Sequence, residues 1–135
     1  MKRIFTILFL CFIITPVFAQ YSNPLEGSWG LVSFKYTLPD TVLIGNANTF
    51  NSIQIFSKTY FSYVGRTTQD NAFKRAGGGR YKLSGDTLTL LIDYSSIPNM
   101  LGKAFKFKCT FDGNKWYHSG QINDIYVEEL WQKLE

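Results

Sequence analysis

The stretch "AFKFKCTF", Ala104 to Phe111, decides the fold, because apolar and polar residues alternate along it. The apolar residues occupy every second position, at Phe105, Phe107, Cys109 and Phe111. Successive side chains of a strand point to opposite faces of a sheet, so this alternation predicts a strand with one buried face and one wet face. The buried face belongs either to an ordinary core or to the wall of a cavity.

The first 19 residues, "MKRIFTILFLCFIITPVFA", differ in character from the rest of the chain. Lys2 and Arg3 precede an apolar run that is interrupted by Pro16 and ends in a small-residue site at Ala19. This order is typical of a cleavable secretory signal peptide, and the run falls short of the ~20 residues that a membrane-spanning helix needs. We therefore expect an extracytoplasmic protein, periplasmic or secreted, with no stable membrane anchor after cleavage and a mature domain at residues 20–135.

Residues 20–135 are enough for one domain with a single modest core. The net charge of +4 at pH 7 falls to +2 once Lys2 and Arg3 are removed, and so mild a surplus argues against nucleic acid as a partner. Cys109 is the one cysteine of the mature chain, so an intramolecular disulfide is excluded. Stability must then come from packing and from sheet hydrogen bonds.

The mature chain consists of strand-like segments separated by turn residues, without a long segment of helical period. Eight strands are predicted, at 28–38, 51–57, 59–67, the two arms of a hairpin within 79–94, 104–111, 115–120 and 125–134. The polar stretch "TQDNAFKRAGGG" at 68–79 is interpreted as a loop. Such a series folds either into a closed up-and-down barrel or into a two-sheet sandwich. Closure is favoured because it removes exposed edge strands, so the fold class is an all-β, antiparallel barrel of about eight strands.

Four segments together resemble parts of the small bacterial exported lipocalin-like domains, a calycin-type family largely of unknown function. They are "LEGSW" (25–29), "AGGGRYKLSGDTLT" (76–89), "GNKWYHSG" (113–120) and "VEELWQKL" (127–134). The resemblance implies a barrel that binds its ligand in the mouth. It also implies that Gly27 and Trp29 form the Gly-x-Trp signature at the closed end, with Trp29 beneath a basic residue, here Lys133 in place of the family's frequent Arg.

The side chains predicted to face the interior are unusually aromatic. The candidate ligand-binding residues are Phe61, Tyr63, Tyr81, Leu90, Phe105, Phe107, Trp116, His118 and Glu129, and the structural residues are Gly27, Trp29, Trp131 and Lys133. Tyr94 is placed on the same inner face, and beyond Trp29 the phase of the first strand stays open. Aromatic rings with polar groups suit a planar, partly polar ligand, whereas the alternative is that these rings fill the barrel.

Leu90 and Glu129 bear on the chemistry of the interior. The relatives carry an acid at the position of Leu90, so this cavity is expected to be more apolar than theirs. Glu129 shares its face with Val127 and Trp131 and therefore points inward. It is expected to fix a polar or cationic group of a ligand, or to pair with Lys133, or to lie in water at the rim.

Other chemistry is sparse in the sequence. A tight turn at 113–114 would place Cys109 opposite His118, but no third orienting group accompanies this pair, so no catalytic residue is assigned. One histidine, one mature cysteine and scattered acids provide no metal-ligand spacing, and no metal or cofactor is expected. The three glycines at 77–79 are interpreted as a flexible start of a strand, and Lys74, Arg75 and Arg80 as a solvated basic patch or an anion contact at the mouth.

These observations favour a non-catalytic, exported binder of a small, largely hydrophobic or aromatic molecule. The alternative is a filled barrel at the cell envelope whose loops bind another protein, for which exposed apolar residues at 42–44 or 97–101 would be the evidence. An enzyme acting at the barrel mouth would require Cys109 and His118 to form a reactive pair. The sequence does not identify the ligand or the oligomeric state.

Overall fold

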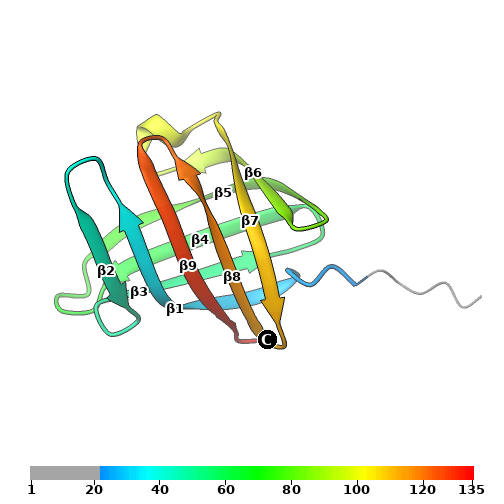
Figure 1. Ribbon diagram of the computed structural model, residues 1–135, viewed down its shortest axis with the longest axis horizontal. Coiled ribbons are helices and arrows are strands. Elements are labelled where there is room, and N and C mark those ends of the chain that lie inside the picture. Colours follow the sequence, from blue (N-terminus) through cyan, green and yellow to red (C-terminus); the bar gives the residue numbers. More distant parts are fainter. Residues whose placement is uncertain (1–21) are drawn as a thin grey trace, which may run out of the picture.

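The computed structural model describes residues 22–135, so the predicted signal peptide lies outside the described residues. These residues form nine strands and one short 3₁₀ helix (Figure 1). The elements are β1 (Gly27–Thr37), β2 (Val42–Asn46), β3 (Phe50–Phe56), β4 (Tyr60–Thr67), β5 (Phe73–Ser84), β6 (Thr87–Ser95), η1 (Pro98–Met100), β7 (Ala104–Asp112), β8 (Lys115–Ile122) and β9 (Ile125–Lys133). Among these residues there is no helix of the length and apolarity that crossing a bilayer requires.

The sheet closes on itself through β1. One side of β1 pairs with β3 over Gly27–Gly30, and its other side pairs with β9 over Trp29–Thr37. The remaining strands pair in chain order, each antiparallel to the next, so β1 and β3 to β9 form a closed eight-stranded barrel (Figure 1). The predicted fold class, an antiparallel up-and-down barrel, is confirmed.

The ninth strand, β2, was not predicted. It pairs with the second half of β1, from Ser33 to Thr37, on the side that β3 has left, and it lies at the end of the strand order. Its run "VLI" does not alternate between apolar and polar residues, since neither face of this strand packs against the core. Val42 and Leu43 are each 49% exposed, and Ile44 is 77% exposed. The strand therefore adds an apolar edge beside the barrel.

A bulge in β1 settles the phase that the sequence left open. The pairing with β9 shifts register between Leu31 and Ser33. One extra residue reverses the alternation, so Trp29 and Leu31 face inward before the bulge, and Phe34 and Tyr36 face inward after it. Both apolar sets of this strand thus contribute to one interior.

The loop predicted at 68–79 is wrong over most of its length, because β5 begins at Phe73. Its glycines are required by close backbone approach: a Cβ atom on Gly79 would lie 2.0 Å from the carbonyl oxygen of Leu91. A register shift between Gly78 and Gly79 accompanies this contact. The shift turns Tyr94 outward, where it is 72% exposed, so its placement on the inner face is also wrong.

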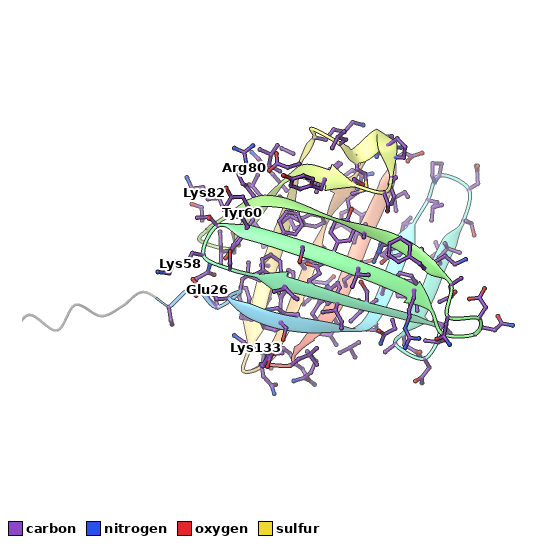
Figure 2. All side chains as sticks on the ribbon, turned by 180° about the vertical axis from the view of Figure 1, so that it is seen from behind. Glu26, Lys58, Tyr60, Arg80, Lys82 and Lys133 are labelled. Atoms are coloured by element: carbon purple, nitrogen blue, oxygen red, sulfur yellow. The ribbon has the colours of Figure 1, made fainter. Side chains whose placement is uncertain are left out.

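The closed end of the barrel is packed with indole rings. Trp29, Trp116 and Trp131 are almost completely buried, and the ring centroids of Trp116 lie 5.6 Å from Trp29 and 5.9 Å from Trp131. Lys133 Nζ lies 5.3 Å from the Trp29 ring centroid and donates a hydrogen bond to the Glu26 carbonyl at 2.7 Å. Figure 2 shows Lys133 and Glu26 at the outer surface.

Gly27 occupies a position in β1 where glycine is needed. Its φ of +121° lies in a region that side chains disfavour, and a Cβ atom there would be 2.3 Å from the Glu135 carbonyl oxygen. The first and last strands of the barrel therefore meet closely at this end.

Candidate functional site

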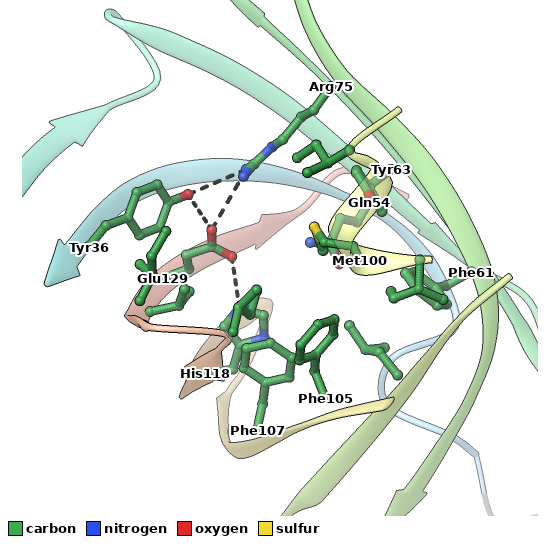
Figure 3. Close-up of a pocket in the computed structure, with 16 residues that line it drawn as sticks. Tyr36, Gln54, Phe61, Tyr63, Arg75, Met100, Phe105, Phe107, His118 and Glu129 are labelled. Atoms are coloured by element: carbon green, nitrogen blue, oxygen red, sulfur yellow. Dashed lines mark hydrogen bonds and ion pairs between the residues drawn. The ribbon is translucent and has the colours of Figure 1, made fainter. Parts of the chain in front are cut away.

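The barrel encloses a cavity of about 160 Å³ that is partly open to solvent (Figure 3). Most of its wall is apolar, contributed chiefly by β4, β6, β7 and β9. The innermost apolar side chains are those of Phe61, Leu90, Ile92, Phe105, Phe107 and Val127. Strand alternation points every second residue of these strands into the barrel, which explains why the wall is built from regular strands rather than from loops.

Four half-buried aliphatic side chains complete the lining near its exposed part. Ile97 and Met100 come from the connection that contains η1, and Ile122 and Ile125 flank the turn between β8 and β9. Apolar side chains on two connections allow this part of the lining to contact the apolar portion of an occupant.

A polar cluster centred on Glu129 lies on one side of the cavity (Figure 3). The Tyr36 hydroxyl donates to Glu129 Oε1 at 2.5 Å, while His118 Nε2 at 2.7 Å and Trp131 Nε1 at 3.1 Å donate to Oε2. Burial alone would raise the pKa of this carboxyl, but the hydrogen bond and charge of His118 and the charge of Arg75 lower it to about 2. Glu129 is therefore ionised at neutral pH, and three of its roughly four acceptor sites are used.

Arg75 of β5 reaches the same cluster from the opposite wall. Its Nη2 donates to the Tyr36 hydroxyl at 3.3 Å and lies 3.8 Å from Glu129 Oε1, and its guanidinium carbon lies 4.8 Å from the Phe50 ring centroid. Burial would lower the pKa of Arg75, but Tyr36 and Glu129 raise it, so the guanidinium stays charged. Burial and the Glu129 charge also raise the pKa of the Tyr36 hydroxyl, which stays protonated.

Three buried side-chain polar atoms in residues 22–135 have no hydrogen-bond partner, namely Gln54 Oε1, Arg75 Nε and His118 Nδ1. All three belong to side chains that line the cavity. An unpaired buried polar group costs about 1–3 kcal/mol, and native proteins leave few of them. These three atoms are the buried polar groups of the lining that remain available for hydrogen bonding.

Two of the solved structures similar to this chain come from Bacteroides. A lipocalin-like protein from Bacteroides uniformis matches with a TM-score of 0.53 and 16% identity, over 83% of this chain and 100% of that one. An uncharacterized protein from Bacteroides eggerthii matches with a TM-score of 0.51 and 16% identity, over 81% of this chain and 98% of that one. The chain has a lipocalin-like fold. No family model and no curated protein matches the chain, so the comparisons establish the fold of this lipocalin-like barrel and not an activity.

Seven of the nine predicted ligand-binding residues line the cavity of the lipocalin-like barrel. They are Phe61, Tyr63, Leu90, Phe105, Phe107, His118 and Glu129. The alternation of each strand identified their inward direction correctly, and Phe61 rather than the exposed Tyr60 faces inward on β4. Glu129 does not contact Lys133 as one alternative proposed, because its partners are Tyr36, His118, Trp131 and Arg75.

Tyr81 and Trp116 do not line this cavity, and a ligand-binding role for them stays a prediction. The Tyr81 hydroxyl donates to the Ser57 carbonyl at 2.5 Å and accepts from Asn23 Nδ2 at 2.6 Å. Trp116 is fully buried against the other indoles, and its Nε1 donates to Cys109 Sγ at 3.3 Å. Both side chains point inward, as strand alternation predicts, but they lie at the closed end of the barrel. Alternation specifies the face of a strand and not the depth along the barrel.

The sequence analysis missed three polar residues of the lining. Tyr36 was obscured by the bulge in β1. Arg75 was interpreted as part of a solvated basic patch or as an anion contact at the mouth, whereas it lies in β5 with its side chain half-buried beside Glu129. Gln54 was detectable, since it shares the inner parity of Ser52 and Phe56 in "NSIQIFS". A polar residue on an otherwise buried face is the signal that could have found it.

Cys109 and His118 lie directly opposite one another on β7 and β8, in the register that the sequence predicted. They do not form a nucleophile and base: burial raises the pKa of the Cys109 thiol to about 11, and His118 Nε2 is engaged by Glu129. Within residues 22–135 no three His, Cys, Asp or Glu side chains are grouped so as to bind a metal ion.

Proposed function

We propose that this protein is a non-catalytic, lipocalin-like binding protein that takes a small, largely apolar ligand into its barrel. The observation that carries the proposal is the cavity of about 160 Å³ with a mainly apolar wall. Apolar cavities of about 150 Å³ bind benzene-sized molecules, whereas water gains little from such a wall. A filled barrel would leave no comparable space.

The volume limits what the cavity can hold. Sites for drug-sized ligands measure about 300–1,000 Å³, so about 160 Å³ accommodates one ring or a short chain. A longer ligand would extend past Met100 and Ile125, which line the cavity and are only half-buried. The aromatic wall, with Phe107 stacked on His118 at 4.5 Å between centroids, favours a planar ligand.

A binding role is supported over catalysis because the described residues offer no activated nucleophile. The Cys109 side chain is a buried thiol, and the Glu129 carboxylate is held by three hydrogen-bond donors. The signal-like sequence at residues 1–19 adds the proposal that the protein acts outside the cytoplasm.

Native mass spectrometry of the protein purified from its own cell envelope tests this proposal. We expect a reproducible adduct that is lost on unfolding. Leu90→Phe, which adds bulk to the cavity wall, should abolish the adduct, while Leu91→Phe on the neighbouring, outward position should retain it. An adduct that persists in Leu90→Phe, or that is absent from the unaltered protein even after addition of apolar probes, would refute the proposal.

A second candidate function is protein interaction through β2. The exposed Val42, Leu43 and Ile44 form an apolar strip on an edge strand, which is a surface that other strands or apolar partners recognise. Chemical cross-linking in the envelope, with Ile44→Lys as the variant, tests it. A cross-linked partner that disappears in Ile44→Lys would support this function, and an unchanged pattern would exclude it.

A further inference from the structure

The unpartnered polar atoms of the cavity specify which hydrogen bonds an occupant can make. Arg75 Nε can only donate, and Gln54 Oε1 can only accept. His118 Nδ1 is a third unpartnered atom, and its role depends on the protonation of the ring. Figure 3 shows Arg75, Gln54 and His118 on different sides of the same space. An occupant thus meets at least one free donor and one free acceptor on an apolar wall.

Arg75 and Glu129 form a pair of opposite charges in the cavity wall, since Arg75 Nη2 lies 3.8 Å from Glu129 Oε1. A carboxylate bound at Arg75 would lie beside the Glu129 carboxylate, and an ammonium bound at Glu129 would lie beside the guanidinium. Like charges at this separation in a poorly solvated site repel each other strongly.

A cationic ligand finds little room at Glu129. Tyr36, His118 and Trp131 already use three of the roughly four acceptor sites of the carboxylate. The oxygen with the remaining site, Oε1, lies 3.8 Å from Arg75 Nη2, so a new cation there would lie beside the guanidinium.

We propose, on the basis of the proposed function, that the ligand is an uncharged molecule with an apolar body and a carbonyl-type acceptor beside an N–H or O–H donor, as in a primary amide. The carbonyl oxygen accepts from Arg75 Nε–H, and the donor is directed to Gln54 Oε1. The body of the ligand packs against Leu90 and Phe105. Such a ligand satisfies both of these polar atoms and adds no charge to the balanced pair.

Isothermal titration calorimetry with four probes of one ring size tests this inference. Benzamide is neutral and carries both a donor and an acceptor, benzoate is an anion, benzylamine is a cation, and toluene has no polar group. The titrations are made at about pH 7, where benzoate is an anion and benzylamine is a cation. We expect benzamide to bind at least about tenfold more tightly than each of the other three, since leaving polar groups unpaired or placing like charges together costs that much or more.

Two variants change the charge balance in opposite directions. Glu129→Gln leaves Arg75 uncompensated, so benzoate should gain at least about tenfold relative to benzamide. Arg75→Met removes the free donor, so benzamide should lose its advantage over toluene. Lys74→Met is the matched control, because Lys74 is exposed and does not line the cavity, and its probe preferences should equal those of the unaltered protein.

The outcomes distinguish this inference from the proposed function. Tighter binding of benzoate or benzylamine than of benzamide, or an unchanged preference in Arg75→Met, overturns the inference while leaving a ligand-binding barrel. If Glu129→Gln does not fold, the comparison of Arg75→Met with Lys74→Met still decides. Failure of all four probes to bind overturns the proposed function, and the inference with it.

Discussion

Replacing Glu129 by Gln should destabilise the barrel in a strongly pH-dependent way. The surroundings lower the pKa of Glu129 from 4.5 to about 2, and each unit corresponds to about 1.4 kcal/mol. The ionised form of Glu129 therefore contributes about 3 kcal/mol of stability at neutral pH. Gln resembles the protonated acid in shape and lacks its charge, so Glu129→Gln should lose about this amount at pH 7.

The sign of the pH dependence follows from the lowered pKa. A carboxyl whose pKa is depressed in the folded state stabilises the fold above its unfolded pKa, and this stability is lost as the pH falls toward the folded pKa. The window for Glu129 runs from 4.5 down to about 2. By about pH 3 roughly 2 kcal/mol is lost, so the difference between the unaltered protein and Glu129→Gln should shrink to about 1 kcal/mol.

Urea unfolding of both proteins at several pH values measures this difference directly. Glu128→Gln is the matched control, since Glu128 faces outward, pairs with Lys35 at 3.2 Å and should contribute at most about 1 kcal/mol. A difference for Glu129→Gln that stays constant from pH 7 to about pH 3, or that equals the control, would refute the reasoning about the buried cluster.

Three further predictions concern other parts of the barrel. The Cys109 thiol is buried and its pKa is raised to about 11, so it should resist alkylation in the folded protein at neutral pH and react after unfolding. Mass spectrometry measures the labelling, and rapid labelling of the folded protein would contradict this prediction. Gly79→Ala should lower the unfolding free energy by about 1–3 kcal/mol in urea titrations, because the added Cβ would meet the Leu91 carbonyl. Gly85→Asn, at an open turn with a φ of +62°, should lower it clearly less. Equal losses would argue against close backbone approach as the reason for the glycine at position 79. Lys133→Met should lower the unfolding free energy by about 1 kcal/mol, because it removes the contact with the Trp29 ring and the hydrogen bond to the Glu26 carbonyl. An unchanged unfolding free energy would show that neither interaction contributes.

Strand alternation carried most of the fold prediction. Period two is strict in 104–111, and the residues at its inner positions, such as Phe105 and Phe107, face the interior as expected. Closure was predicted from short successive hairpins and was confirmed by the pairing of β1 with β9. These features are local in sequence, so they can be recognised without the tertiary structure.

The errors came from features that alternation does not contain. The bulge in β1 and the register shift at Gly78 and Gly79 each reverse the parity of a strand, which hid Tyr36 and misplaced Tyr94. The glycine run resembled a loop because the reason for the glycines is a close backbone contact with the neighbouring strand β6, which residue propensities do not reveal. Neither shift has a signature that single-sequence propensities capture.

The candidate site could be predicted only partly, because strand alternation gives the direction of a side chain but not its partners. His118 and Glu129 were correctly directed inward, but their mutual hydrogen bond and the approach of Arg75 depend on three different strands. Depth along the barrel, which separates Trp116 at the closed end from the cavity residues, is set by strand tilt and register together. A strand pattern alone does not provide either of these.

A methyl NMR titration with benzamide tests the central proposal, that the barrel cavity binds a ligand, most directly. The account predicts saturable shifts of the methyl groups of Ile92, Met100 and Val127, which line the cavity, with no change at the exposed Ile44 and Ile55. Shifts confined to the outer methyl groups, or no shifts at saturating benzamide and in parallel titrations with benzoate, benzylamine and toluene, would contradict it.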